Sequence, residues 1–399
     1  MTTLDFRLIQ QLQPELARVR QDIHAHPELG FQEHRTAALV EQSLRDWGYE
    51  VHTGIGGTGV VGVLQGSLPE PGPSIGLRAD MDALPIQEKS GLPHQSRHAQ
   101  VMHACGHDGH TAILLGTAQY LAKTRAFSGR VVLIFQPAEE GLGGAQAMLD
   151  DGLFERFPCD EIYALHNWPG LPPGVIGVNP GPMMAAADEF DIVVHGKGGH
   201  GAHAYQTIDP IVISAQLITA LQTLVSRNVP AMDAAVLTVA AIQAGRLEAR
   251  NVIHDQARLS GTVRTFKPEV QELVVERMQN MIKGMAAAYD VRIELEYRRL
   301  FPATINHDGP AAKVASVAHS LFGADMVQYP FTPSMGAEDF SYMLQVCPGA
   351  YFRLGQGGAE QGRVLHNAIF DFNDDVIANG VAMFVGLVQS GAYPVGNGQ

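Results

Sequence analysis

Short apolar runs alternate with segments of helical spacing over residues 53–166. Residues 74–79, 131–135 and 162–165 are apolar runs of the length and composition of buried strands in a parallel sheet. Residues 110–122 repeat apolar side chains at the spacing of one helical face. This alternation predicts an α/β fold in which helices cover a sheet.

The middle of the chain follows another order. Asp209 and Pro210 supply a capping side chain and a first-turn proline, so a helix is expected to begin there and to continue to about residue 227. A second helix is expected from Pro268 to about residue 289. Strands are predicted at residues 190–194, 234–244, 257–265 and 291–297. The resulting order, β-α-β-β-α-β, is that of a ferredoxin-like unit.

These two patterns divide the 399 residues into two domains, which suits a chain of this length. Residues 186–298 are predicted to form an inserted ferredoxin-like domain. Residues 1–185 and 299–399 are predicted to form one discontinuous α/β domain with a mixed sheet, because the last segment contains further strand and helix patterns.

Composition narrows the function classes. Apolar residues make up 46% of the chain and charged residues 17%, as in folded globular proteins. The net charge of −14 disfavours general binding to nucleic acids or anionic membranes. No apolar run approaches the ~18 residues needed to cross a bilayer. The amino-terminal segment resembles an amphipathic helix and lacks a signal-peptide core, so a cytoplasmic location is expected.

The densest group of reactive side chains lies at residues 102–110, which contain Cys105, three histidines and an aspartate. Thiolate and imidazole together favour zinc-like ions over calcium or magnesium. The chain has three cysteines that are far apart, which disfavours a disulfide framework and leaves Cys105 free to bind a metal ion. The alternative is that these histidines are surface or helix-capping side chains.

Further polar residues follow the predicted strands, at the sheet edge where open α/β folds bind ligands. Of the adjacent Glu139 and Glu140, one carboxylate can bind metal while its neighbour serves as a general base; the alternative is a solvated acidic pair. Asp80 and Asp82 would share one strand face, where one could orient a ligand histidine, unless they cap a helix or form a turn. His166, like the isolated His366, is on its own more typical of a hydrogen-bonded core histidine in an apolar or strand-like context.

The predicted inserted domain carries weaker signals. His200 and His203 lie in a glycine-rich run, which is also typical of a mobile loop with incidental histidines. Asn251 and Arg264 are isolated, although a guanidinium group suits bidentate binding of a carboxylate.

Taken together, the chain resembles the M20 metallopeptidase family, in particular its amidohydrolase branch of hippurate hydrolases, N-acyl-amino-acid amidohydrolases and auxin-conjugate hydrolases. The segments that carry the resemblance are HAHPELGF at 24–31, RADMDALP at 78–85, the cysteine segment at 102–110, QPAEEG at 136–141, ALH at 164–166, GKGGH at 196–200, GTVRTF at 261–266, GAEDF at 336–340 and LHN at 365–367. They extend over nearly the whole chain, and the ordered set is far more specific than any member alone.

The resemblance implies a site for two divalent cations, zinc or manganese in the first place, with cobalt and nickel as further candidates. Its implied metal ligands are Cys105, His107, Glu140, His166 and His366. His103 and His110 then take supporting or structural roles. Glu139 matches the general base, and Asp82 matches the aspartate that supports the metal site.

The same resemblance implies that the inserted domain is a lid and dimerisation domain, so a homodimer or higher homo-oligomer is expected. His200 matches a lid histidine that stabilises the oxyanion, often in the active site of a partner subunit. Asn251 and Arg264 fall where the lid contacts the substrate carboxylate.

The implied reaction is hydrolysis of the amide bond of a small N-acyl amino acid, with an acetyl, benzoyl or aryl-acetyl group, to a carboxylic acid and a free amino acid. A dipeptidase or aminopeptidase with the same two-metal site is one alternative, and a metal- or redox-responsive binding protein is another. The chain departs from the branch at His203-Ala204-Tyr205, where Met-Pro-His is usual, and at His254, where proline is usual. Both departures lie in the lid and bear on substrate preference.

Overall fold

The structure, a computed structural model, describes residues 4–390, which form two compact units. The first unit holds the chain up to Met183, Ile305–Pro333 and the chain from Asp339 onward; the second holds Met184–Thr304 and Ser334–Glu338. The sequence places the boundaries of the insertion at 186 and 298, whereas the compact second unit extends to Thr304 and takes in a short later segment. The ends of the predicted first domain, residues 1–3 and 391–399, lie outside the described residues.

The first unit is built on an eight-stranded sheet with the order β1-β2-β4-β3-β5-β16-β6-β15. Its strands are β1 (Glu50–Ile55), β2 (Gly59–Gln65), β3 (Ser74–Asp80), β4 (Arg130–Gln136), β5 (Glu161–Trp168), β6 (Ile176–Gly177), β15 (Val327–Gln328) and β16 (Gly349–Gly355). The four central strands β4, β3, β5 and β16 are parallel to one another. On one side β2 is antiparallel to β4 and β1 is antiparallel to β2, and on the other side β6 is antiparallel to β16. The sheet is therefore mixed, as the sequence predicts.

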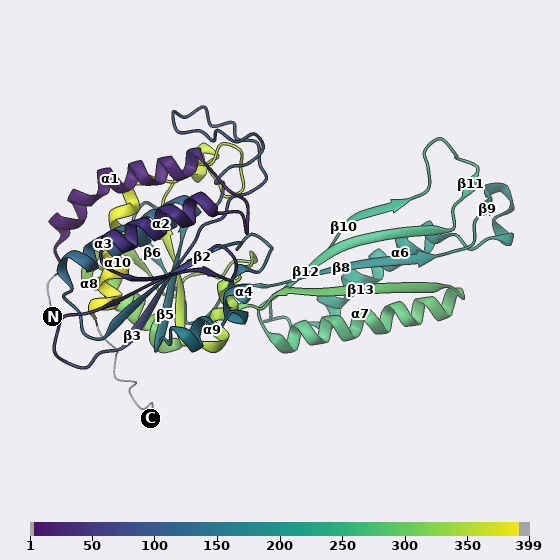
Figure 1. The fold of residues 1–399 in the computed structure, drawn as a ribbon. Coiled ribbons are helices and arrows are strands. Elements are labelled where there is room, and N and C mark those ends of the chain that lie inside the picture. Colours follow the sequence, from purple (N-terminus) through teal and green to yellow (C-terminus); the bar gives the residue numbers. More distant parts are fainter. Residues whose placement is uncertain (1–3, 391–399) are drawn as a thin grey trace, which may run out of the picture. The chain divides into compact units, whose positions relative to one another are not determined.

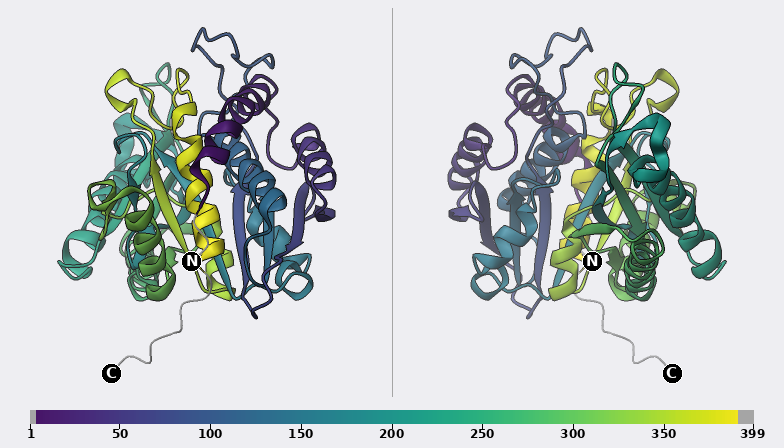
Figure 2. Two further views of the ribbon diagram at one scale, coloured as in Figure 1. Left: turned by 90° about the vertical axis from the view of Figure 1, so that its left-hand side faces the viewer. Right: turned by 90° about the vertical axis from the view of Figure 1, so that its right-hand side faces the viewer.

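Helices cover both faces of this sheet (Figures 1 and 2). They are α1 (Phe6–Ala25), α2 (His34–Asp46), α3 (His107–Thr124), α4 (Gly144–Asp150), α5 (Leu153–Arg156), α8 (Asp308–Phe322), α9 (Phe340–Val346) and α10 (Ile377–Gln389). Successive side chains of β16 show the two faces, because Phe352 packs on Phe384 of α10 while Tyr351 packs on Phe340 of α9. With apolar partners on both sides, all seven residues of β16 are buried.

The second unit has a four-stranded antiparallel sheet with the order β10-β12-β8-β13. It contains β8 (Ala186–His195), α6 (Pro210–Thr223), β10 (Ala235–Ala244), β12 (Gln256–Thr265), α7 (Pro268–Tyr289) and β13 (Arg292–Phe301) in chain order. This is the predicted ferredoxin-like arrangement, and α7 has the predicted bounds. The helices α6 and α7 pack on the sheet through Ile213, Leu217, Val274 and Met278.

Several shorter strands and helical turns lie between these elements. The pair β9 (Gly199–His200) and β11 (Val252–Ile253) lies in the second unit, and β7 (Gly181–Met184) pairs with β14 (Thr304–Asn306). A π-helical turn, η2 (Leu224–Asn228), prolongs α6, and a 3₁₀ segment, η1 (Gly201–Gln206), follows β9. Among residues 4–390, no helix combines the length and the hydropathy that crossing a membrane requires.

Candidate metal centre and hydrolytic site

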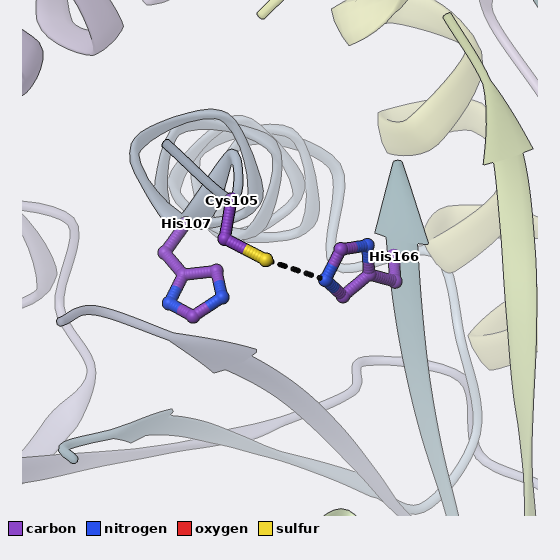
Figure 3. A group of neighbouring side chains, drawn as sticks. All are labelled: Cys105, His107 and His166. Atoms are coloured by element: carbon purple, nitrogen blue, oxygen red, sulfur yellow. Dashed lines mark hydrogen bonds between the residues drawn. The ribbon is translucent and has the colours of Figure 1, made fainter. Parts of the chain in front are cut away.

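The parallel strands bring distant residues to one edge of the sheet. β3 ends at Asp80, β4 ends at Gln136 shortly before Glu139, and His166 lies near the carboxyl end of β5. Cys105 lies two residues before the start of α3, and His107 is the first residue of this helix. Figure 3 shows Cys105 and His107 beside the start of α3 and His166 on β5, with the thiol of Cys105 pointing at the imidazole of His166. Residues 61 positions apart in the chain thus meet at this edge.

His166 is held in one tautomer. Its Nδ1–H donates to the backbone oxygen of Asn167 at 2.7 Å, so Nε2 carries a lone pair, and this atom lies 3.4 Å from the Sγ atom of Cys105. Burial, followed by the charges of His110 and Arg353, lowers the pKa of His166 well below its usual value. The neutral imidazole that results is the form that binds metal ions.

His107 is oriented in the same way. Its Nδ1 lies 3.1 Å from Asp82, while its buried Nε2 has no hydrogen-bond partner among residues 4–390. Burial opposes protonation, but the charges of Asp80 and Asp82 outweigh it and raise the pKa of His107 to about 10. A group of carboxylates that attracts a proton this strongly also attracts a divalent cation, which would replace the proton.

Glu140 and His366 complete the group. The carboxylate of Glu140 lies 3.2 Å from His366 Nε2 and 4.0 Å from His107 Nε2, and the backbone N–H of Glu140 donates to Asp82 at 2.9 Å. The interaction with Glu140 raises the pKa of His366. The strand-like context predicted for His366 is wrong: it lies in a turn with φ +62°, and its N–H donates to the oxygen of Ala104 at 2.8 Å.

These side chains form overlapping groups that could hold metal ions. In each group the candidate ligand atoms lie within 4.8 Å of one another, and the groups are Cys105-His107-His166, Cys105-Glu140-His366 and His107-Glu139-Glu140. Burial, and then the nearby carboxylates Glu140 and Glu139, raise the pKa of the Cys105 thiol well above its usual value. Without a cation the thiol is protonated and unreactive. The unpaired His107 Nε2 and the mixed sulfur, nitrogen and oxygen donors fit a zinc-class ion.

A tight turn places Glu139 beside this group. Glu139 is 7% exposed, and Ala138 before it has a left-handed backbone with φ +52°. Gly141 and Gly143 also have positive φ. The turn closes where the Gly144 N–H donates to the oxygen of Ala138 at 3.0 Å.

Asp80 and Asp82 do not share one strand face as predicted, because β3 ends at Asp80. The two carboxylates contact different histidines: Asp82 lies 3.1 Å from His107, and Asp80 lies 2.6 Å from His110. His110 also contacts Asn167, which makes it part of a buried network behind the metal ligands.

Several buried charged residues around the site were not predicted from the sequence. Arg78 donates to Asp80 at 2.7 Å and to Asp339 at 3.2 Å, although a charged residue within an apolar strand was a visible signal. Arg20 binds Asp374 through Nε and Nη2 and lies 3.5 Å from Asp108. Arg20 lies on the apolar face of α1, four residues after Leu16 and three before Ile23, so its position was a signal of burial, and it is 1% exposed. His103 is buried, and burial lowers its pKa to about 4.

The three remaining predicted residues belong to the second unit. His200 on β9 pairs with Val252, and the N–H of Gly201 donates to the oxygen of Asn251 at 2.7 Å, so His200 and Asn251 lie close together. Arg264 lies at the other end of β12 from this pair of short strands, and its Nη1 donates to the oxygens of Asp188 and Val263.

Comparison with known proteins decides the family. Residues 76–390 match the family described as Peptidase family M20/M25/M40. The chain belongs to the M20 family. It is 43% identical over 379 residues to a hippurate hydrolase of Campylobacter jejuni, and the aligned region covers 95% of this chain and 97% of that protein. It is 40% identical to an N-acetylcysteine deacetylase of Bacillus subtilis, over 91% of this chain and 93% of that one.

Solved structures agree with the M20 assignment. A dinuclear metal-binding peptidase of the M20 family from Bacillus subtilis superposes with a TM-score of 0.82 and 36% identity, over 96% of this chain and 98% of that chain. The chain is therefore an M20 hydrolase with a mixed α/β fold and candidate metal-binding residue groups.

Proposed function

We propose that this M20 hydrolase cleaves the amide bond of N-acyl amino acids, releasing a carboxylic acid and a free amino acid. The observation that carries the proposal is the convergence of Cys105, His107, Glu140, His166 and His366 beside the buried Glu139. The similarity to a hippurate hydrolase and to an N-acetylcysteine deacetylase supports this class of substrate.

In this proposal the five converging side chains hold two divalent cations, zinc or manganese. When bound, the cations would lower the pKa of a water molecule toward ~7 and polarise the substrate carbonyl. His166 and His107 each present Nε2 because their Nδ1 atoms are occupied by Asn167 and Asp82. Asp82 also fixes the backbone of Glu140, so one carboxylate orients two ligands.

Glu139 is proposed as the general base. Its carboxylate takes a proton from the attacking water and delivers it to the leaving amide nitrogen, which lets the carbon–nitrogen bond break. His200 is proposed to donate a hydrogen bond to the oxyanion, and Asn251 and Arg264 to bind the substrate carboxylate. These three side chains belong to the second unit, which is proposed to act as a lid.

A homodimer is part of the proposal. β10 is an edge strand of the second unit, and its sequence, AVLTVAAIQA, contains no charge and no proline. An exposed edge of this composition favours pairing with a second copy of the chain. A cytoplasmic location is proposed as well, because Cys105 must stay reduced to bind a metal ion.

The proposal is tested by a turnover screen of acetyl, benzoyl and indole-acetyl amino acids with zinc, manganese, cobalt or nickel supplied singly. Glu139→Gln should keep its metal content and lose about 10²- to 10⁴-fold in kcat. Unimpaired turnover by this variant would refute the role of Glu139. Turnover of unblocked dipeptides alone would favour the peptidase alternative, and stoichiometric metal binding without any turnover would favour a binding protein.

A further inference from the structure

Ala138 has a backbone conformation that residues with a side chain rarely adopt. Its φ is +52°, and its side chain is fully buried. It lies between β4 and Glu139, so its dihedral angles set the direction in which the chain enters Glu139. Such conformations persist only where neighbouring groups enforce them, and they concentrate at functional sites. The groups that hold Ala138 at positive φ therefore bear on the position of Glu139.

Glu33 is the group that binds the amide of Ala138. Its side chain is 0% exposed; Oε1 accepts the N–H of Ala138 at 2.8 Å, and Oε2 accepts the hydroxyl of Thr58. Glu33 immediately precedes α2, and Thr58 lies in the turn between β1 and β2. The carboxylate thus joins the turn before Glu139 to a segment 105 residues earlier in the chain.

The surrounding groups restrict Ala138 on its other sides. A Cβ atom built on Gly30 would lie 3.0 Å from the Cβ of Ala138, so the two segments are in close contact. The oxygen of Ala138 accepts the N–H of Gly144. Glu33 binds the N–H on the opposite side of the residue. Without this acceptor the buried N–H would be unsatisfied, and the residue would rotate toward negative φ to find another partner.

We propose that Glu33 is a positioning residue for Glu139: by binding the N–H of Ala138 it holds the left-handed turn that points the Glu139 carboxylate at the metal-binding group. This inference rests on the proposed role of Glu139 as general base. Glu33 itself touches neither the candidate metal ligands nor the reacting atoms, and acts through Ala138 alone.

Two variants of similar size separate the hydrogen bond from packing. In Glu33→Gln the amide oxygen still accepts the Ala138 N–H, and the amide nitrogen can donate to Thr58; in Glu33→Leu both bonds are lost. Glu33→Leu should lose about 10- to 100-fold in kcat, because a displacement of about 1 Å at a reacting group has effects of this size. Its KM and metal content should stay close to those of the parent, and Glu33→Gln should retain most of the activity.

Glu28→Leu is the matched control. Glu28 precedes the same helix, and its carboxylate accepts three hydrogen bonds from Arg35 and Thr36 without touching Ala138. This variant should unfold at a lower temperature than the parent but keep its kcat. If Glu33→Leu does not fold, Glu33→Val removes the same acceptor with a smaller side chain and should lower kcat in the same way. The proposal is overturned if the variant that lacks the acceptor at position 33 keeps the kcat of the parent. It is also overturned if Glu28→Leu or Glu33→Gln loses as much kcat as that variant.

A crystal structure of Glu33→Leu, or of Glu33→Val in its place, gives a readout that does not depend on turnover. The proposal expects Ala138 at negative φ and a displaced Glu139 carboxylate; an unchanged left-handed Ala138 overturns it. Failure of the proposed function has a different signature, namely that Glu139→Gln hydrolyses N-acyl amino acids as fast as the parent.

Discussion

Replacing Gly144 with alanine should inactivate the enzyme through the backbone of the turn before Glu139. An added Cβ would lie 1.7 Å from the oxygen of Pro137 and 2.6 Å from its carbonyl carbon. Real Cβ atoms stay at least 3.0 Å from such atoms, so the backbone at Gly144 and the carbonyl oxygen of Pro137 must move apart by at least 3.0 minus 1.7, or 1.3 Å. The obstacle is backbone, which cannot rotate away as a side-chain end could.

The displaced peptide group joins Pro137 to Ala138, immediately before Glu139. A shift of this size at a reacting group corresponds to about a 100-fold loss in kcat. Hydrolysis of a benzoyl or acetyl amino acid at saturating substrate measures this loss, and metal analysis of the same sample shows whether the cations are retained. The Cys105-His107-His166 group lies outside the turn and should keep its cation, whereas Glu140 lies within the turn, so a cation held through Glu140 should be bound more weakly.

Gly141→Ala is the control within the same turn. A Cβ there meets nothing within 4 Å, so its cost is the left-handed φ of +77° alone, about 1–2 kcal/mol of stability. This variant should keep a kcat close to that of the parent. The reasoning is wrong if Gly144→Ala is as active as the parent, or if both alanine variants lose the same amount of activity.

Three further predictions concern metal binding and stability. Asp82→Ala should weaken metal binding about 10- to 100-fold, because Asp82 fixes the tautomer of His107; a competitive chelator titration measures this, and unchanged affinity would contradict the role. Arg20→Met should lower the free energy of unfolding by about 3–5 kcal/mol in a urea titration, because it removes the buried guanidinium that three carboxylates share, whereas Arg45→Met at an exposed pair should cost at most about 0.5 kcal/mol. The two losses should not be equal. Burial opposes protonation of His24, but the neighbouring carboxylates raise its pKa from 6.5 to about 9, so protonated His24 stabilises the fold fully below pH 6.5 and loses this effect as pH rises through 9. His24→Gln should therefore be less stable than the parent at pH 6.5, and the difference in their free energies of unfolding should shrink as the pH rises to 9.5. A difference that grows over this range would refute the stabilising role of protonated His24.

Local periodicity was sufficient to predict the four strands of the second sheet, the strands β3, β4 and β5 of the first, and the helices α1, α3, α6 and α7. The strands β4 and β12 extend at most one residue beyond their predicted ends, and α7 runs from Pro268 to Tyr289 as its pattern indicates. Burial of alternate or one-sided positions produces these periods directly, so each can be read from a short window. The π-helical turn after α6 could not be predicted, because its residues have the same apolar spacing as the helix before it.

Some residues of the candidate site could likewise be predicted from local sequence patterns, whereas others could not. The cluster at residues 102–110 was recognisable from its thiol and imidazoles, but only the family resemblance singled out His107 among its histidines. Glu139 and Glu140 were recognisable from their adjacency after a buried strand. His166 and His366 could not be told from core histidines by their neighbours alone, and only the family resemblance singled them out. The structure places His366 in a left-handed turn, tied to Ala104, and not in the strand-like segment that its sequence predicts.

The sequence alone therefore determined the two kinds of sheet, the order of their elements and the chemical types of the candidate ligands, since these follow from short-range patterns. Tertiary structure decided which ligands meet, because β3, β4 and β5 are parallel and their carboxyl ends share one edge. It also decided which charged side chains are buried. Arg20, Asp108 and Glu33 depend on partners 25 to 354 residues away for their hydrogen bonds, and no local pattern records such contacts. Glu33 accepts the N–H of Ala138, and Asp82 contacts His107, through contacts of this kind, because a buried polar group persists only where a distant partner satisfies it.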